Sequence, residues 1–316
     1  MLCVACHDAG GAEVLASLVA RRPLNCKLLL DGPARQVFQR RLGRQTDLLT
    51  IQQALVECDS FLTGSSWQSD LEWGVIRAAR AAGKQVVTFL DHWGHYRERF
   101  VRNGDECLPD AIWVGDEDAF SMANGLFSGI PVELVPNPYF EDVRDTVARF
   151  SLSIPTEDEP TQKELRVLFV CEPLSEHGAK EFGDPLHWGY SEFDALRYFC
   201  SRLNLLGLPV AEVVIRPHPS EKKGKYDAVA KLLGEVVRVG GDHPLLQEIA
   251  ACDVVAGCES MAMVVGLIAG RRVVSAIPPG GRPCSLPQRK IQSLAALEEA
   301  ASCDSAPPLN LPSQSL

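Results

Sequence analysis

The chain has 316 residues, of which 46% are hydrophobic and 23% are charged, as in an ordinary soluble globular protein of about two domains. Its formal net charge of −10 argues against nucleic-acid binding, which needs a basic face, and disfavours docking on an anionic bilayer unless a local basic patch overrides the average. No apolar run approaches the about 20 residues of a membrane-spanning helix. The first residues carry Asp8 and no basic segment, so they do not resemble a secretion signal.

The cysteines are eleven in number and scattered, mostly within apolar stretches. Cys3 and Cys6 have the spacing of a redox or zinc pair, but they lie within an expected strand and no second pair matches them. Buried, reduced thiols in a cytoplasmic protein are the better interpretation. We expect no bound metal and no cofactor.

The first half of the chain alternates short apolar runs with helical patterns. Strands are predicted at 2–6, 26–30, 60–63, 85–90, 111–114 and 132–135, and helices at 12–21, 33–42, 69–82 and 117–126. Alternation of this kind is typical of a parallel sheet with helices on both faces.

The second half begins after residues 151–164, which are acidic, lack periodicity and therefore indicate an interdomain linker. A helical pattern at about 287–302 is expected to pack back across the first domain. The Ser/Pro-rich tail 304–316 is expected to be disordered. Strands are predicted at 166–170, 211–215, 235–239, 252–256 and 272–276, and further helices at 190–205, 225–233, 244–250 and 260–269.

These patterns predict an α/β protein built from two Rossmann-like, doubly wound parallel-sheet domains, 1–150 and 165–303, that face a cleft. Ligands of such sheets bind beyond the carboxyl ends of the strands and favour domain interfaces. The loops that follow the predicted strands are therefore the places to look for a site.

The most informative loop follows the strand 211–215 and reads Arg216-Pro217-His218-Pro219-Ser220. A histidine held between two prolines has little backbone freedom, because each proline ring fixes its own φ and restricts the residue before it. Arginine and histidine together suit a phosphate. The alternative is a surface loop that carries a histidine by chance.

The loop after the first strand contains His7, Asp8, Gly10 and Gly11. A strand, a Gly-Gly turn and a helix start can bind an anion or a sugar through free amides, whereas the patterns of dinucleotide and ATP sites are absent. Asp8 is placed to act as a general base, unless it only caps the helix. His7 and Glu13 are its rivals.

Polar and aromatic residues are dense after the strand 85–90, where Asp91, His92, Trp93, His95 and Arg99 follow one another closely. Aromatic faces with hydrogen-bonding edges suit sugars, so we expect this loop to bind the acceptor substrate. The alternatives are a structural aromatic cluster, or a metal held by His92, His95 and Asp91, for which the spacing alone is weak evidence.

Two further loops of the second half end in polar residues. Glu172 follows the strand 166–170, and Glu259 precedes a helix start at Ser260 and Met261. The first amides of that helix would cradle a phosphate, and Glu259 would accept hydrogen bonds from ribose or sugar hydroxyls. The alternative is a plain serine cap of the helix. Arg282 is a further candidate for contact with a phosphate or carboxylate.

With an Arg-Pro-His-Pro loop and a later Gly-x-Glu-Ser helix start, the chain resembles the GT-B glycosyltransferase superfamily over roughly residues 1–302. His218-Pro219 resembles the His-Pro motif of bacterial sialyltransferases, polysialyltransferases and related capsule or lipopolysaccharide transferases. A similar motif occurs in teichoic-acid CDP-glycerol transferases. The Asp/Glu-Asp/Glu-Gly motif of the sialyltransferases is absent.

This resemblance implies a metal-independent glycosyltransferase of bacterial surface polysaccharide biosynthesis. It would move a sugar from a nucleotide-activated donor to a glycan or lipid-linked acceptor, with peripheral membrane association as an option. The alternatives are a nucleotide-sugar epimerase or hydrolase, a CDP-alcohol phosphotransferase, and a non-catalytic sugar- or nucleotide-binding module.

The resemblance also implies roles for single residues. His218 would stabilise or protonate the leaving phosphate, and Asp8 of the first domain would be the base. The donor site of the second domain would comprise Arg216, Pro219, Glu172, Glu259, Ser260 and Met261. The acceptor site would comprise Gly10, Gly11, Asp91, His92, Trp93, His95 and Arg99.

Overall fold

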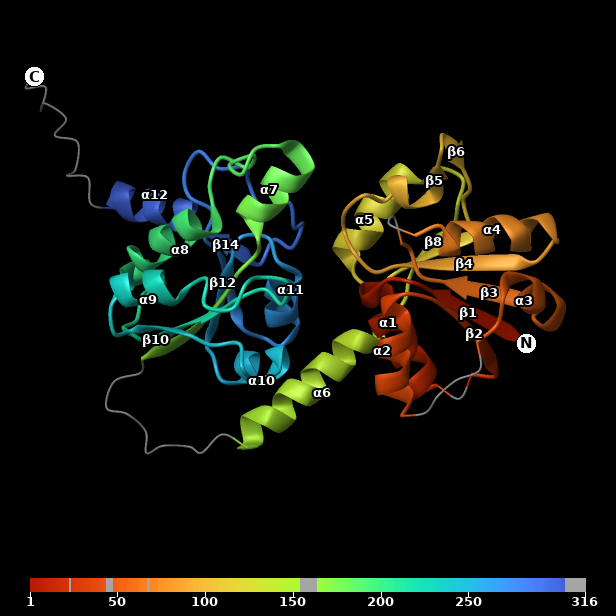
Figure 1. Cartoon of the computed structure of the whole chain (residues 1–316), viewed down its shortest axis with the longest axis horizontal. Coiled ribbons are helices and arrows are strands. Elements are labelled where there is room, and N and C mark those ends of the chain that lie inside the picture. The colour runs from red at the N-terminus through yellow and green to blue at the C-terminus, as the bar shows by residue number, and fades with distance from the viewer. Residues whose placement is uncertain (23, 44–47, 67–68, 154–163, 305–316) are drawn as a thin grey trace, which may run out of the picture. The chain divides into compact units, whose positions relative to one another are not determined.

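A computed structural model describes residues 1–22, 24–43, 48–66, 69–153 and 164–304. Contacts divide the chain into two compact units, Met1–Asp142 (unit 1) and Val143–Leu316 (unit 2). Figure 1 labels their helices and strands. Most of the expected linker and the tail from residue 305 lie outside the described residues, so the disorder of the tail stays a prediction.

The core of unit 1 is a six-stranded parallel sheet in the order β2-β1-β3-β4-β7-β8. Side chains of α1 and α2 pack with those of the first two strands in one hydrophobic cluster. The strands are β1 (Leu2–Cys6), β2 (Cys26–Leu30), β3 (Ser60–Thr63), β4 (Gln85–Leu90), β7 (Ala111–Val114) and β8 (Val132–Leu134). The helices are α1 (Ala9–Arg21), α2 (Pro33–Leu42), α3 (Ile51–Glu57), α4 (Leu71–Ala81) and α5 (Glu117–Leu126), with a 3-10 turn η1 (Glu98–Phe100) and a hairpin of β5 (Val101–Arg102) and β6 (Asp105–Glu106).

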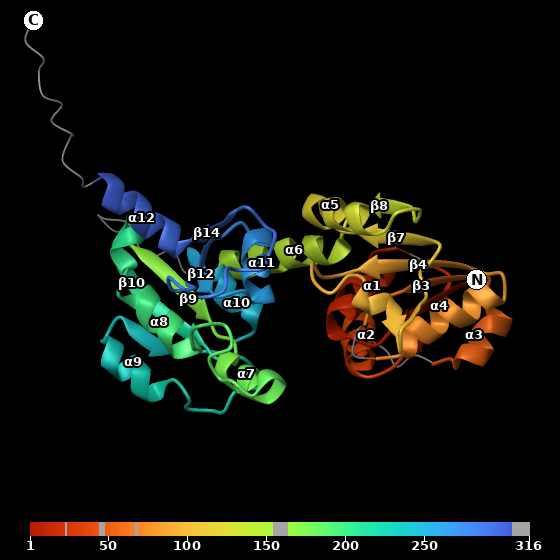
Figure 2. The same ribbon diagram turned by 90° about the horizontal axis from the view of Figure 1, so that it is seen from above.

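Unit 2 contains a second six-stranded parallel sheet, in the order β11-β10-β9-β12-β13-β14. Figures 1 and 2 show α8 and α9 on one face of this sheet and α10 and α11 on the other. The strands are β9 (Leu165–Val170), β10 (Val210–Arg216), β11 (Val237–Val239), β12 (Val254–Gly257), β13 (Arg272–Ser275) and β14 (Ile291–Ser293). The helices are α7 (Leu174–Phe182), α8 (Glu192–Cys200), α9 (Asp227–Leu233), α10 (Leu245–Ala250), α11 (Met261–Ile268) and α12 (Leu294–Asp304), with a 3-10 turn η2 (Leu203–Leu206).

Each sheet reverses its winding once. In unit 1 the first strand, β1, lies between β2 and β3, and in unit 2 the first strand, β9, lies between β10 and β12. Chain connections leave these central strands in opposite directions, which opens a crevice at their carboxyl ends where ligands of such sheets bind. The fold therefore singles out the ends of β1 and β3, and of β9 and β12.

The predicted α/β class with two doubly wound parallel sheets is confirmed, and each predicted strand is present. The reason is local: central strands such as β1 are buried on both faces, so they read as short uninterrupted apolar runs. Helix α6 (Pro138–Ser153), α3 and α7 were not predicted. The signal for α6 was Asn137-Pro138, since Asn137 Oδ1 accepts the N–H of Tyr139 at 3.0 Å and proline suits a first helical position.

The helix expected at 287–302 is wrong in its first part. Residues 291–293 form β14, and α12 begins at Leu294, which is fully buried in the core of unit 2. The carboxylate of Glu298 accepts the hydroxyl of Tyr198 at 2.8 Å and the guanidinium of Arg202 at 2.5 Å. These contacts attach α12 to unit 2, and its packing against the first domain stays a prediction. The expected linker also begins too early, because residues 151–153 belong to α6.

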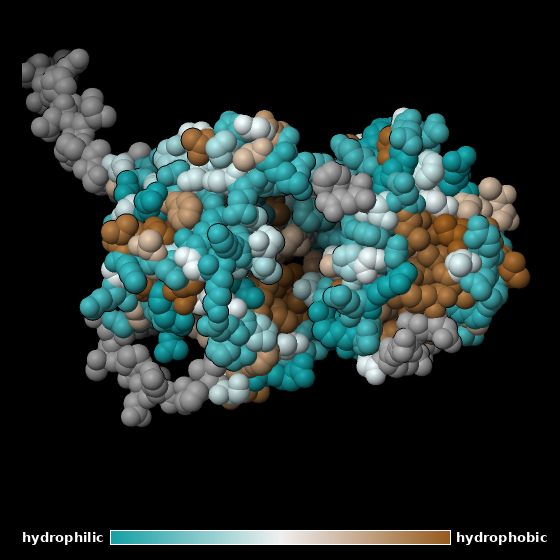
Figure 3. Space-filling model, viewed as in Figure 1, coloured by the Kyte–Doolittle hydropathy of each residue, from teal (hydrophilic) through white to brown (hydrophobic). Residues whose placement is uncertain are grey.

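Cys3 and Cys6 point to opposite faces of β1, because they stand three positions apart on a strand. They therefore do not form the redox or zinc pair that their spacing suggested. Ten cysteines lie among the described side chains, and all ten are free thiols. Within the described residues, no helix is long and apolar enough to cross a membrane. Figure 3 shows apolar side chains gathered on one face of unit 1, over the region of β3 and α3.

Candidate functional site

At the carboxyl edge of the unit 2 sheet, Glu172 connects the segments that follow β9 and β12, the two strands between which the sheet reverses its winding. Its Oε1 accepts the backbone N–H of Glu259, which follows β12, at 2.9 Å. Burial raises the pKa of Glu172 to about 7, although backbone hydrogen bonds from the loop oppose this rise. The sequence predicts that the helix start after Glu259 holds a phosphate. The Glu259 N–H beside it already donates to Glu172, so it is not available to that phosphate.

The carboxylate of Glu259 is held by the loop after β13. It accepts the N–H and the hydroxyl of Ser285 at 3.1 and 2.9 Å, and Arg282 lies 3.2 Å from its other oxygen. Ser260 is the N-cap of α11, and its Oγ accepts the N–H of Ala262 at 3.2 Å. Ser260 thus serves as a plain helix cap, the alternative to a phosphate contact, and Met261 at the first helical position is exposed.

The loop after β10 holds His218 in a defined orientation. The ring is exposed, and its Nδ1 lies 2.7 Å from Ser220 Oγ and accepts the Ser220 N–H at 3.2 Å. Because Nδ1 accepts a backbone N–H, we assign the proton of the neutral ring to Nε2. His218 therefore offers Nε2–H as a donor at the carboxyl edge of the sheet, with the exposed Pro219 beside it.

Arg216 does not accompany His218 in this role. Its guanidinium pairs with the carboxylate of Glu248 and donates to the carbonyl of His243 at 2.8 Å. The side chains of Arg216 and Glu248 are only 17% and 10% exposed. Since this pair occupies the cation, the expectation that Arg216 binds a donor phosphate is not supported by its geometry.

In unit 1, His7 and Asp8 form a pair at the carboxyl end of β1. His7 Nδ1 lies 2.8 Å from Asp8 Oδ1, and both side chains are partly exposed. Asp8 stands at the N-cap of α1, yet its side chain makes no capping hydrogen bond there. The capping alternative therefore does not explain Asp8, and its carboxylate is left with the neighbouring imidazole as its partner.

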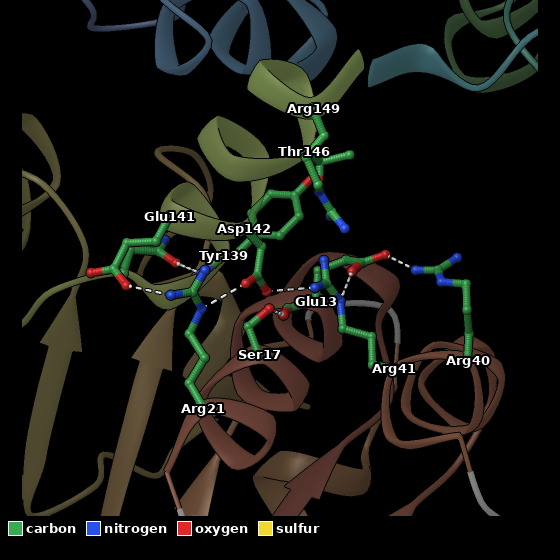
Figure 4. A network of polar contacts seen from close by, with 11 residues as sticks. Glu13, Ser17, Arg21, Arg40, Arg41, Tyr139, Glu141, Asp142, Thr146 and Arg149 are labelled. Atoms are coloured by element: carbon green, nitrogen blue, oxygen red, sulfur yellow. Dashed lines mark hydrogen bonds and ion pairs between the residues drawn. The ribbon is translucent and has the colours of Figure 1, made fainter. Parts of the chain in front are cut away.

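Glu13, a rival of Asp8, is engaged elsewhere. It pairs with Arg40 and with Arg41, whose Nε lies 2.7 Å from Glu13 Oε2. Arg41 continues to Asp142 at 2.5 Å, and Arg21 reaches the other oxygen of Asp142 at 2.6 Å. Figure 4 shows this alternating chain of charges between α1, α2 and the start of α6. Glu13 therefore has a structural role and is not a candidate base.

The Gly-Gly turn serves close packing within unit 1. A Cβ at Gly10 would collide with the carboxylate of Asp91, and one at Gly11 would lie 3.3 Å from Cys6 Sγ. Asp91 Oδ1 in turn accepts the hydroxyl of Ser65, which follows β3, at 3.1 Å. The turn thus lets the start of α1 approach the ends of β3 and β4, and this accounts for both glycines without a bound anion.

The aromatic loop after β4 is partly a structural cluster. Trp93 is 6% exposed, and its Nε1 donates to the Asp116 carboxylate at 3.0 and 3.1 Å. Arg99 is 7% exposed and donates to the carbonyls of Ser65 and Gly94. The expectation that Trp93 and Arg99 bind an acceptor is therefore not supported, because both side chains are buried and serve the protein itself.

The two histidines of that loop are not buried. His95 is exposed and adopts a φ of 54°, and the Nδ1 of His92 accepts the N–H of Gly94 at 3.1 Å. These two side chains remain candidates for contact with an acceptor. Within the described ranges, no group of three or more His, Cys, Asp or Glu side chains is placed to hold a metal ion.

Glu72, at the second position of α4, was not predicted as a site residue. Its Oε1 accepts the backbone N–H of His7 at 2.7 Å, and its buried Oε2 has no hydrogen-bond partner among the described residues. Burial raises the pKa of Glu72 to about 7. A glutamate in a first helical turn normally faces solvent, so the sequence offers no sign that this one supports the His7–Asp8 pair.

No protein-family model matches the sequence, and no curated protein matches it. Similar solved structures exist. A UDP-GlcNAc 2-epimerase from Neisseria meningitidis, bound to UDP-GlcNAc, aligns at 10% identity and a TM-score of 0.57 over 95% of this chain and 90% of its own. A UDP-GlcNAc 2-epimerase from Methanocaldococcus jannaschii aligns at 10% identity and a TM-score of 0.57, over 95% of this chain and 91% of its own. An alpha/beta-galactoside alpha-2,3-sialyltransferase from Photobacterium phosphoreum aligns at 9% identity and a TM-score of 0.52, over 93% of this chain and 99% of its own.

At this level of identity the likeness establishes the fold alone. The protein has the GT-B fold, with two Rossmann-like sheets, and the likeness covers nearly the whole chain. The more specific resemblance of His218-Pro219 to the His-Pro motif of sialyltransferases stays a prediction.

Proposed function

We propose that this protein is a glycosyltransferase that moves a sugar from a nucleotide-activated donor to a glycan or glycoconjugate acceptor. The observation that carries the proposal is the grouping at the carboxyl edge of the unit 2 sheet. There the segments that follow the neighbouring strands β10, β9 and β12 carry His218, Glu172 and Ser260, each two or three residues past its strand. Adjacent strands lie about 4.8 Å apart, so these three strand ends are within reach of one diphosphate or monophosphate ester.

In the proposed reaction, the bond between the anomeric carbon and the donor phosphate breaks, and the acceptor oxygen bonds to that carbon. Negative charge then grows on the departing phosphate. Nε2–H of His218 and the positive end of the α11 helix dipole would stabilise this charge, more strongly in the transition state than in the ground state. Because the loop and the helix fix both groups in advance, they need little reorganisation during the reaction.

The acceptor proton is assigned to unit 1. Asp8 is the proposed base, because its carboxylate is partly exposed and is not used as a helix cap. His7 is hydrogen-bonded to it and would orient the carboxylate. A positioned carboxylate of this kind contributes about 10²–10⁴-fold to a transfer rate. His92 and His95 are the proposed acceptor contacts, and no metal is assigned a role.

A nucleotide-sugar epimerase is the second candidate. It is favoured by the likeness to two UDP-GlcNAc 2-epimerases over 95% of this chain, at a TM-score of 0.57. An epimerase would bind the nucleotide sugar in unit 2 in the same way, but would return it with inverted configuration at one carbon of the sugar. Transfer is preferred because unit 1 offers, in the Asp8 carboxylate that makes no capping bond, a base for an acceptor hydroxyl.

Two experiments test this proposal in sequence. Thermal-shift measurements with CMP, UDP, GDP and CDP would identify the donor base, since a ligand at 100 times its Kd stabilises the native state by about 2.7 kcal/mol. Sugars linked to that nucleotide would then be incubated with and without glycan acceptors. Nucleotide release that depends on the acceptor supports transfer, release without it indicates hydrolysis, and a changed sugar without release indicates an epimerase. Binding of none of the four nucleotides would contradict all three.

A further inference from the structure

A buried carboxylate lies directly beneath the His218 loop. The side chain of Glu221 is 0% exposed, and its Oε2 accepts the backbone N–H of His218 at 2.8 Å. Its Oε1 accepts Lys225 Nζ at 2.7 Å and the hydroxyl of Tyr226 at 2.8 Å. Three donors thus hold both oxygens, as a buried carboxylate requires, and one of these donors belongs to the backbone of the candidate catalytic histidine.

Lys225 extends this arrangement to the neighbouring loop. Its Nζ lies 2.5 Å from Glu192, whose side chain is 3% exposed, and 3.2 Å from the more exposed Glu176. Burial disfavours the charged amine, but the surrounding carboxylates prevail and raise the pKa of Lys225. Glu192 Oε2 accepts the N–H and the hydroxyl of Ser175 at 2.9 and 2.7 Å.

The bonds form a continuous chain from the start of α7 to the loop after β10. Ser175 stands three residues after Glu172, so the chain connects the loop that carries Glu172 to the loop that carries His218. The flanking prolines restrict the backbone of His218, yet they leave open how the whole loop sits on the sheet. The hydrogen bond to Glu221 supplies that missing constraint.

We propose that Glu221 is the positioning residue that aims His218, and that Lys225 and Glu192 tie this position to the β9–α7 loop. The proposal rests on the proposed function for its catalytic consequence, but its structural consequence can be measured without any substrate. Loss of the Glu221 bond frees the His218 N–H, so the loop reorients and the bond from Ser220 N–H to Nδ1 weakens. The ring then exchanges between its two tautomers.

The test compares Glu221→Gln with Glu176→Gln. An amide at 221 cannot accept from both His218 N–H and Lys225. Glu176 touches the same lysine and is 58% exposed, but the His218 N–H bonds to Glu221 and not to Glu176. Imidazole ¹⁵N shifts of His218 are recorded on the free protein, together with turnover of the donor sugar identified by nucleotide release. We expect Glu221→Gln to show mixed tautomers and a 10- to 100-fold lower kcat with donor KM within threefold, and Glu176→Gln to match the wild type.

The outcomes separate the two claims. Wild-type ¹⁵N shifts and turnover in Glu221→Gln would overturn the positioning role. Mixed tautomers in Glu221→Gln, combined with wild-type turnover in His218→Ala, would leave the positioning role intact and remove the proposed function. If Glu221→Gln does not fold, Glu221→Asp keeps the charge and the lysine pair but shortens the reach to His218. It should also give mixed tautomers, and a wild-type spectrum of that variant would overturn the inference.

Discussion

Glu72 Oε1 accepts the backbone N–H of His7 at 2.7 Å, although 65 residues separate them in the sequence. An equivalent bond occurs in unit 2, where Glu172 Oε1 accepts the N–H of Glu259 at 2.9 Å. In each unit a glutamate, fully buried in unit 1 and half-buried in unit 2, therefore fastens a strand-end loop at the point where the sheet reverses its winding. Burial raises the pKa of both carboxyl groups to about 7.

Glu72 makes stability depend on pH in a predictable direction. Its pKa in the folded protein is about 7 against 4.5 for an unperturbed glutamate, so the folded state holds the proton more tightly. The stabilisation is complete below about pH 4.5 and is lost as the pH rises towards 7, by at most about 1.4 kcal/mol per pH unit. Glu72→Gln lacks this loss. Its thermal midpoint should therefore rise relative to wild type between pH 5 and 7 and run parallel above; a constant difference from pH 5 to 8 would contradict the assignment.

Glu172 should make nucleotide binding depend on pH. When its buried carboxyl is ionised, it repels a phosphate placed at the start of α11, so affinity should fall as the pH rises through about 7. Isothermal titration with the nucleotide found by thermal shift, at pH 6 and pH 8, would measure this. We expect wild type to weaken more than Glu172→Gln, by up to about tenfold, because one pKa unit corresponds to about 1.4 kcal/mol. Identical pH dependence in the two proteins would remove Glu172 from the donor site.

Arg216 should matter for stability more than for binding. Replacing it by glutamine leaves the mostly buried Glu248 without its cation, which costs about 2 kcal/mol of unfolding free energy. Urea denaturation would show this as a lower midpoint with an unchanged slope. Nucleotide Kd should stay within threefold. A stable Arg216→Gln protein with tenfold weaker nucleotide binding would restore the phosphate role that the sequence suggested.

Trp93 should behave as a core residue. Trp93→Phe removes the hydrogen bond to Asp116 while keeping most of the buried ring, so we expect a loss of about 1 kcal/mol in unfolding free energy. The acceptor KM should change by less than threefold, whereas His92→Ala should raise it. An acceptor KM that rises several-fold in Trp93→Phe with unchanged stability would mean that the indole contacts the acceptor after all.

The order and type of most elements could be predicted from the sequence because buried parallel strands are short apolar runs bounded by loops. The carboxyl edges of both sheets were found for the same reason. What each polar side chain does there could not be predicted. Arg216 and Trp93 looked available for ligands. Arg216 instead pairs with Glu248, 32 residues further along the chain, and Trp93 donates to Asp116, 23 residues further along.

Two other residues, Glu72 and Glu221, were not predicted to have any special role, yet the structure buries their side chains. Glu221 stands in a polar stretch and Glu72 in a first helical turn, where solvent exposure of a glutamate is the normal expectation. Their burial follows from the tertiary packing of α4 against the end of β1, and of the 217–226 loop against α7 and α8. Contacts of this kind depend on the folded arrangement of distant elements, and no periodicity along the chain reveals them.

Nucleotide release from the preferred sugar donor, measured in the presence of acceptor, shows whether His218 acts on a departing nucleotide phosphate. Wild type would be compared with His218→Ala, and Arg216→Gln would serve as the neighbouring control. We expect His218→Ala to release nucleotide at least 100-fold more slowly while its thermal midpoint stays within about 2 °C of wild type, because the ring is exposed and packs against little. Wild-type release by His218→Ala would contradict the account.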